Sequence, residues 1–219
     1  NKLAEFIVDL IPDGATIQLG FGGLGNAIGH MLHGKKDLGM HSEVVTPSVT
    51  ELVKAGVLTC SNKNFYPGKI ITAFAVGTKQ FYDDLNRNEL FEFKEVHWVN
   101  QPMNIAQNDN LISINNTLMI DLTGQAASES IGTKQYSGTG GQVNFNQGAK
   151  MSRGGKRILA LASTYTDKDG KLKSKLLPTL PEGSIVTTSR NEQEYLVTEF
   201  GVVNIALDSI STRVKKIIS

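Results

Sequence analysis

Residues 15–26 read ATIQLGFGGLGN, and this stretch decides the fold class. Its first five residues, 15–19, alternate in polarity, which predicts a half-buried β-strand. Glycines follow in the order G-x-G-x-x-G, and Asn26 is a capping residue that predicts a helix over residues 27–32. A strand, a glycine turn and a helix in this order are typical of an α/β fold.

The rest of the chain alternates strand and helix patterns at first, and strands dominate later. Helices are expected over residues 1–11, 47–56, 79–86 and in the C-terminal tail; strands are expected over residues 69–77, 96–100, 111–122, 157–163, 184–188 and 195–198. Residues 124–155 are glycine-rich with little periodicity, so we expect a long loop that is either flexible or functional. The pattern predicts one layered α/β domain with a mixed sheet over residues 1–219.

Composition excludes several function classes. The chain has 219 residues, 40% of them hydrophobic, and a formal net charge of +1. The hydrophobic content is too high for a disordered chain, and the charge argues against an electrostatic nucleic-acid binder. No apolar stretch approaches the roughly 20 residues needed to span a bilayer, so we expect no membrane partner. The single Cys60 excludes an internal disulfide framework, which favours a cytoplasmic location.

The glycine loop that begins at Gly20 allows two interpretations. It can be a simple tight turn, or it can let the backbone approach a phosphate at a helix N-terminus. A dinucleotide-binding fold also requires an acid about 20 residues further on, at the end of the second strand. Glu43 has this distance, but the apolar Val44 and Val45 follow it. Glu43 is therefore expected at the start of a strand or in a loop, which counts against nicotinamide binding.

Glu43 is itself a candidate functional residue, because a positioned carboxylate can act as a nucleophile in covalent catalysis. The alternative is a solvated surface acid. The stretch from Ser137 to Gln142, SGTGGQ, is a second candidate, since consecutive glycines expose backbone N–H groups that can form an oxyanion hole. Its alternative is a flexible loop.

Other candidates are weaker. His30 and His33 share a helix face without a nearby third ligand, so we expect no metal site. His41 stands two residues from Glu43, and a surface role is expected for it. A basic group can meet phosphates or form a solvated turn and strand edge; its members are Lys150, Arg153, Lys156 and Arg157.

Several long segments together resemble one protein family. They are GATIQLGFGGLGNAI, KKDLGMHSE, PGKIITAFAVGT, ISINNTLMIDLTGQAASESIG, SGTGGQVNFNQGA and VTTSRNEQEYLVTEFGVVNI. In order and spacing the chain resembles the acetyl-CoA hydrolase/transferase family, and most closely its 4-hydroxybutyrate or butyrate CoA-transferase branch.

The resemblance implies a layered α/β fold of the CoA-transferase (NagB/RpiA-like) type. It implies that residues 1–219 form a single C-terminal domain, preceded in the whole enzyme by an N-terminal domain of related fold. It also implies coenzyme A as a substrate, no metal, and a homo-oligomer.

The resemblance assigns roles to individual residues. Glu43 corresponds to the nucleophile, and the Phe21 amide corresponds to an oxyanion donor. The residues expected to contact coenzyme A are Gly20, Phe21, Gly22, Gly23, Leu24, Asn115, Gly141 and Gln142. Gly140 and Gly141 correspond to the second oxyanion loop, and Glu199 corresponds to a residue that lines the substrate site.

The expected reaction is ping-pong transfer of CoA from an acyl-CoA to a small carboxylate of the acetate, butyrate or 4-hydroxybutyrate class. It would pass through a glutamyl-CoA thioester on Glu43. Two alternatives stay open: an acyl-CoA hydrolase that uses the same glutamate, and a CoA-binding module without turnover.

Overall fold

The computed structural model describes residues 2–219, and its main element is an eight-stranded sheet. Seven strands are parallel, and only β15 pairs antiparallel, with β14, so the sheet is mixed as predicted. In sheet order the strands are β15 (Gly201–Asn204), β14 (Tyr195–Thr198), β10 (Lys156–Ala160), β5 (Leu111–Asn116), β1 (Thr16–Leu19), β2 (Gly39–Val45), β3 (Ile70–Ala75) and β4 (Phe91–Phe93).

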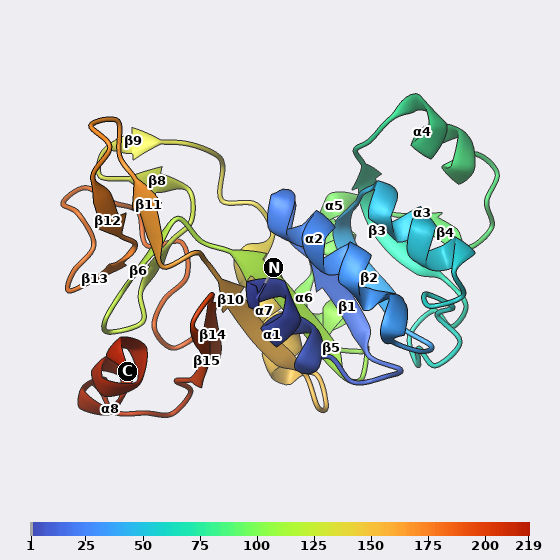
Figure 1. The fold of residues 1–219 in the computed structure, drawn as a ribbon. Coiled ribbons are helices and arrows are strands. Elements are labelled where there is room, and N and C mark those ends of the chain that lie inside the picture. Colours follow the sequence, from blue (N-terminus) through green and yellow to red (C-terminus); the bar gives the residue numbers. More distant parts are fainter. Residues whose placement is uncertain (1) are drawn as a thin grey trace.

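Helices cover both faces of this sheet (Figure 1). One face carries α1 (Lys2–Asp9), α2 (Gly23–Met31), the 3-10 turn η1 (Leu32–Gly34) and α3 (Pro47–Lys54). The other face carries α5 (Val96–Val99), α6 (Pro102–Ile105) and α7 (Gln142–Met151). Two further helices, α4 (Lys79–Leu85) and α8 (Ile210–Ile218), lie at the two ends of the molecule. None of the helices formed by residues 2–219 is long and apolar enough to cross a membrane.

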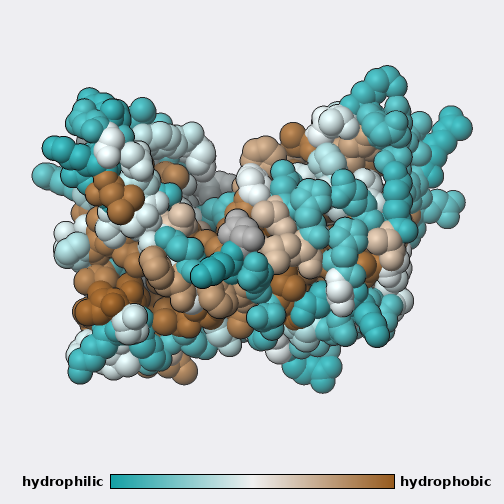
Figure 2. All heavy atoms as spheres, in the orientation of Figure 1, coloured by the Kyte–Doolittle hydropathy of each residue, from teal (hydrophilic) through white to brown (hydrophobic). Residues whose placement is uncertain are grey.

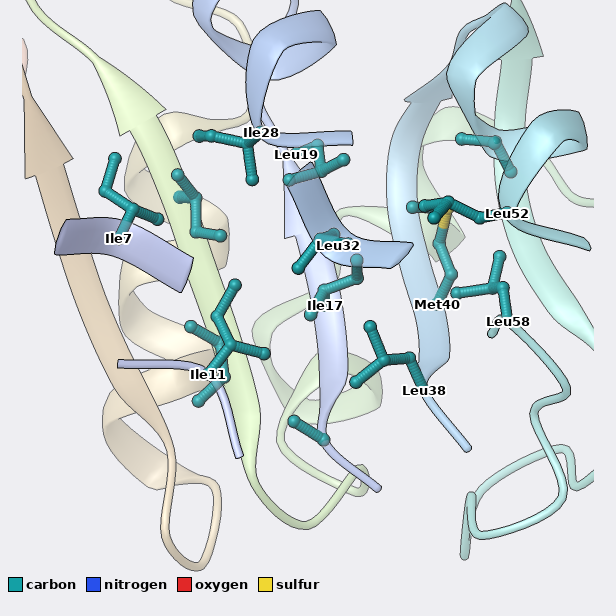
Figure 3. Packing of buried hydrophobic residues seen from close by; sticks show 14 of the residues in the cluster. Ile7, Ile11, Ile17, Leu19, Ile28, Leu32, Leu38, Met40, Leu52 and Leu58 are labelled. Atoms are coloured by element: carbon teal, nitrogen blue, oxygen red, sulfur yellow. The ribbon is translucent and has the colours of Figure 1, made fainter. Parts of the chain in front are cut away.

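The largest apolar core lies between the sheet and α1–α3 (Figure 3). Ile7 of α1, Ile17 of β1 and Ile28 of α2 are fully buried there. The alternating polarity predicts a half-buried strand here, but all four residues of β1 are buried, because helices cover both faces of the sheet at this strand. Burial of each Ile or Leu side chain contributes about 1.5–3 kcal/mol to the free energy of unfolding. A second cluster on the other face includes Val99 and Phe145.

A group of short sheets stands beside the main sheet, on the side of β15 (Figure 1). They contain β6 (Met119–Asp121), β7 (Ala126–Ala127) and β13 (Leu176–Leu177); β8 (Ser130–Ile131) and β9 (Lys134–Gln135); and β11 (Thr164–Thr166) and β12 (Leu172–Ser174). From β9, residues 136–141 run back to the start of α7, and we call this segment the strap.

The strand order places a crevice at the centre of the sheet. From β1, strands β2, β3 and β4 follow on one side, while β5, β10 and β14 follow on the other. The order therefore reverses between β1 and β5. In open α/β sheets, ligands bind outside the carboxyl ends of the strands at such a reversal. The loops after Leu19 and Asn116 both leave the sheet at this point.

Several predicted elements differ from the structure. Residues 96–100 were expected as a strand, but they form α5 and its C-cap, because a short apolar run does not distinguish a strand from a helix. Residues 184–188 contain no strand, only an isolated bridge between Thr188 and Ala126. The glycine-rich range 124–155 contains α7, which weak helix formers such as Gly148 conceal.

Two local predictions near residues 15–45 are also wrong. The helix α2 begins at Gly23, not after Asn26, and its N-cap is Gly22, whose φ of 122° favours glycine. Glu43 lies inside β2 near its carboxyl end, not at the start of a strand. The strand begins earlier than expected because Gly39 and Met40 already pair with β1.

Candidate functional site

A cavity of about 520 Å³ lies at the carboxyl ends of β1, β2 and β5. Figure 2 shows the molecule hollowed between the short sheets and the side of the main sheet that carries β3. Seven of the predicted site residues line the cavity: Gly20, Phe21, Glu43, Asn115, Gly140, Gly141 and Gln142. The fold thus brings together residues that lie as far apart in the sequence as Gly20 and Gln142, a separation of 122 positions.

Glu43 is the acidic residue of this cavity and is partly exposed to it. Its carboxylate lies against the backbone of Gly141, because a Cβ atom built at Gly141 would stand 2.3 Å from Glu43 Oε2. Gly141 is the N-cap of α7, so the positive end of this helix faces the carboxylate.

The first glycine loop approaches Glu43 from the end of β1. The Gly20 amide donates to the Ile114 carbonyl at 2.8 Å, which fixes the loop to β5. Gly25 must be a glycine, because a Cβ atom there would stand 2.2 Å from the Gly20 carbonyl oxygen. In the part of the chain that the structure describes, the Phe21 amide makes no hydrogen bond. It is therefore available to a ligand in the cavity.

The second glycine loop is the end of the strap. Tyr136 N donates to the Glu129 carbonyl at 2.7 Å, and Ser137 N donates to the same oxygen at 3.3 Å. These bonds fix the strap where it enters the cavity. Gly140 has a φ of 61°, a conformation that glycine adopts without strain. Within residues 2–219 the amides of Gly140 and Gly141 donate no hydrogen bond either.

Buried polar side chains form the cavity floor. Gln18 Nε2 donates to Asn115 Oδ1 at 3.1 Å, and Asn115 Nδ2 donates to Ser113 Oγ at 3.0 Å. Gln18 Oε1 also accepts from Ser113 Oγ at 2.8 Å. The Asn115 side chain is therefore held by its neighbours, 7% exposed, at the wall of the cavity.

Asn100 is a site neighbour that sequence reasoning missed. A Cβ atom at Gly141 would stand 2.8 Å from Asn100 Nδ2, so Asn100 and Glu43 flank the same backbone atom. Asn100 Oδ1 is buried without a hydrogen-bond partner within the described residues. Its segment was predicted as a strand. Asn100 is instead the C-cap of the short helix α5, and no sequence motif marks this position as part of a site.

Four predicted residues lie outside this cavity. Gly23, Leu24 and Glu199 line a neighbouring cavity of about 330 Å³, and Asn116 borders both. Gly22 lines neither cavity and serves as the N-cap of α2.

Glu199 is fixed by hydrogen bonds within this second cavity. It accepts from Ser163 N at 2.7 Å and from Ser163 Oγ at 2.6 Å. Burial acts to raise the pKa of this carboxyl, and the two Ser163 bonds lower it; the pKa lies below its ordinary value.

The weaker candidates have structural partners. Each member of the basic group bonds within the chain: Lys150 with Glu192, Arg153 with Asp109, Lys156 with the Leu10 carbonyl, and Arg157 with Glu194. His41 was expected on the surface, but it is fully buried because β2 is covered on both faces. Among residues 2–219 there is no group of three or more His, Cys, Asp or Glu side chains that could hold a metal ion.

The model of the acetyl-CoA hydrolase/transferase C-terminal domain matches residues 77–219. The chain belongs to the acetyl-CoA hydrolase/transferase family. It is 47% identical over 219 residues to the 4-hydroxybutyrate coenzyme A transferase of Clostridium kluyveri, covering all of this chain and 50% of that relative. The chain spans about half the length of the curated relatives it matches.

Solved structures give the same fold. RipA from Yersinia pestis superposes with a TM-score of 0.91 at 41% identity, over 99% of this chain and 48% of that one. The 4-hydroxybutyrate CoA-transferase from Porphyromonas gingivalis superposes with a TM-score of 0.84 at 36% identity, over 99% and 50%. This family member thus has the layered α/β fold of CoA-transferase domains. The family model matches residues 77–219, so Gly141 lies within the matched range and Glu43 lies before it. The same sheet nevertheless carries both sides of the cavity.

Proposed function

We propose that this chain carries the nucleophile of a CoA-transferase, which moves CoA between an acyl-CoA and a small carboxylate. The observation that carries the proposal is the contact between the Glu43 carboxylate and the Gly141 backbone, inside a cavity lined by two glycine loops. Membership of the family supports it, as do relatives named for CoA transfer to or from 4-hydroxybutyrate, butyrate and acetate.

The proposed reaction begins with attack of a Glu43 oxygen on the acyl-CoA carbonyl carbon. The C–S bond breaks, which leaves an acyl-glutamyl anhydride and CoA thiolate. The thiolate then attacks the Glu43 carbonyl carbon and expels the first carboxylate, which gives a glutamyl-CoA thioester. An incoming carboxylate reverses both steps: it forms a new anhydride and releases thiolate, which takes the new acyl group and frees Glu43. This is ping-pong covalent catalysis.

The backbone donors around Glu43 suit the charge that develops in these steps. Each addition to a carbonyl places a negative charge on oxygen, and preorganised N–H groups stabilise such an oxyanion by about 3–4 kcal/mol each. Phe21 N is available on one side of the cavity, and Gly140 N and Gly141 N are available on the other. We propose these amides as the oxyanion donors, with Gly20, Gln142 and Asn115 as contacts of coenzyme A.

The cavity also has an apolar side that suits a short acyl chain. It is lined by Val44, Phe74, Val76 and Phe145. Phe74 is 44% exposed and Val76 is 39% exposed, so this wall is open. We propose acetate, butyrate or 4-hydroxybutyrate as the class of carboxylate. We also propose that an N-terminal domain of the full-length enzyme completes the site, and that the enzyme is a cytoplasmic homo-oligomer.

The neighbouring cavity is proposed as part of the same coenzyme A site. It adjoins the main cavity at Asn116, and Gly23 and Leu24 at the start of α2 border it. Glu199, held in place by Ser163, faces the same space as Lys175. We propose that Gly22, at the N-cap of α2, supports this side of the loop and that Glu199 lines the substrate path.

A trapping experiment tests the role of Glu43. The full-length protein is incubated with butyryl-CoA and then treated with borohydride or hydroxylamine, and its peptides are analysed by mass spectrometry. Modification is expected at Glu43 and absent in Glu43→Gln, which should also lose transfer to acetate. Glu95, whose side chain is 82% exposed, provides the matched control variant Glu95→Gln.

Four outcomes would contradict the proposal. Peptides without modification at Glu43, or full turnover in Glu43→Gln, would remove Glu43 as the nucleophile. Loss of the thioester at the same rate without a carboxylate acceptor would identify an acyl-CoA hydrolase. Binding of butyryl-CoA without any turnover by the full-length protein would identify a CoA-binding module.

A further inference from the structure

His41 lies on the same strand as Glu43, two residues before it. Because side chains alternate along a strand, both residues face the same side of the sheet. His41 is fully buried. One ring nitrogen, Nε2, lies 2.8 Å from the Val99 carbonyl oxygen, and the other, Nδ1, lies 3.2 Å from Asn108 Nδ2.

These partners define the protonation state of the ring. A carbonyl oxygen only accepts, so Nε2 carries the hydrogen that bonds to Val99. The Asn108 amide group donates to the Ile105 carbonyl at 3.1 Å and offers its other hydrogen to His41 Nδ1. Both ring nitrogens are therefore satisfied in the neutral form. Burial lowers the His41 pKa to about 4, against the raising effect of the Val99 bond.

The partners of His41 lead directly to the neighbours of Glu43. Val99 is followed by Asn100, whose Nδ2 atom and Glu43 Oε2 flank the backbone of Gly141. The ring of Phe145, on the first turns of α7, packs edge-on against His41 with 6.1 Å between ring centroids. His41 thus contacts the end of α5 and the beginning of α7, next to Asn100 and Gly141, which are neighbours of Glu43.

We propose that His41 is a positioning residue that fixes Asn100 and the Gly141 backbone against the Glu43 carboxylate. Its hydrogen bond to Val99 sets the end of α5, and its contact with Phe145 sets the start of α7. This inference rests on the proposed function, since it concerns the geometry around the nucleophile. It assigns to His41 no contact with substrate and no proton transfer.

The role is distinct from that of a core residue that only adds stability. Phe65 is partly buried and belongs to the same ring cluster, with its ring stacked on His41 at 6.4 Å between centroids. Its ring also stacks on Trp98 of α5 at 5.9 Å between centroids, but a phenyl ring cannot make the hydrogen bond to the Val99 carbonyl that His41 makes. Phe65→Leu is therefore a matched variant that loosens the cluster and leaves the His41–Val99 hydrogen bond in place.

The test is a double-mutant cycle in the full-length protein, assayed for CoA transfer from butyryl-CoA to acetate. His41→Leu should lower kcat by on the order of tenfold to a hundredfold, with KM for butyryl-CoA changed by less than about threefold. His41→Gln, whose Nε2 can still donate to Val99, should recover part of kcat. In the Asn100→Ala background the His41→Leu change should have a much smaller effect, because the two residues act through one arrangement.

Each other outcome overturns the inference. It fails if His41→Leu has the same fold effect with and without Asn100, or if Phe65→Leu lowers kcat equally at the same melting temperature. Where His41→Leu does not fold, His41→Gln carries the cycle, and independence from Asn100 again overturns it. A failure of Glu43 as the nucleophile gives a different result, because Glu43→Gln would then remain active whatever His41 does.

Discussion

The backbone of Gly141 is in contact with the carboxylate of Glu43: a Cβ atom at position 141 would stand 2.3 Å from Glu43 Oε2 and 2.8 Å from Asn100 Nδ2. Gly141 is the N-cap of α7 and Glu43 lies in β2, so the two residues are 98 positions apart in the sequence. The φ of Gly141 is −92°, so its conformation is open to any residue and only the space requires glycine.

Gly141→Ala should therefore displace the Glu43 carboxylate while the protein stays folded. We expect the rate of CoA transfer to fall by on the order of a hundredfold, because a shift of about 1 Å at a reacting group has an effect of that size. Gly34→Ala is the control, since a Cβ atom there meets nothing within 4 Å. Equal rates for the two variants would show that the contact has no part in transfer.

Asn100→Ala should lower the rate of CoA transfer by about tenfold or more, equivalent to about 1.4 kcal/mol in the barrier, because it removes the amide beside Glu43. The control is Asn104→Ala, which removes the bond from Asn104 Nδ2 to the Trp98 carbonyl in the same segment, whereas the side chain next to Gly141 is that of Asn100. Steady-state kinetics and thermal unfolding of both variants separate the two effects. A larger loss of rate in Asn104→Ala would exclude a specific role for Asn100.

Stability should depend on pH through His41. Its pKa is lowered to about 4 from an ordinary 6.5, mainly by burial. Between these values the unfolded chain binds a proton at His41 and the folded chain does not, so the free energy of unfolding falls as the pH falls. The contribution is up to about 1.4 kcal/mol per pH unit.

Urea unfolding at pH 7, 6 and 5 checks this expectation in the wild type and in His41→Gln. The variant lacks the titrating ring, so its stability should fall less steeply towards pH 5. Equal slopes in the two proteins would mean that His41 has the same pKa in the folded and unfolded states.

Gly148→Ala should destabilise the fold by about 1–3 kcal/mol, because a Cβ atom there would stand 2.3 Å from Ile105 Cγ2 where α6 meets α7. Denaturant unfolding measures the change, and Gly201→Ala, with open space around its Cβ, is the reference. Removing the Ile105 side chain should reduce the cost of the added methyl group. The double variant Ile105→Ala, Gly148→Ala should therefore lose less stability than the sum of the losses of the two single variants.

The sequence predicts the sheet well where a local apolar pattern marks the strand. Thr16–Leu19, Ile70–Ala75 and Tyr195–Thr198 are strands where apolar patterning indicates them, and the G-x-G-x-x-G loop joins a strand to a helix as expected. Gly20, Phe21, Glu43, Asn115 and the second glycine loop meet in one cavity, and the roles that the family resemblance implies for them stay predictions.

Other features depend on contacts that a linear pattern does not contain. Asn144, Asn146 and Gly148 are weak helix formers, and α7 forms because it packs against Ile105 and the sheet. The place of Asn100 follows from the end of a four-residue helix, and the burial of His41 follows from the layer that covers β2. These are properties of tertiary packing.

The central position of β1 has a consequence for synthesis of the chain. One edge of β1 pairs with β2, but the other pairs with β5, and the bond from Gln18 to the Ile114 carbonyl joins residues 96 positions apart. During translation this inner edge stays unpaired until β5 emerges, and an open strand edge is a template for unwanted association. The crevice between β1 and β5 cannot exist before then, so a ribosome-bound chain that ends before residue 111 would have Glu43 without its cavity.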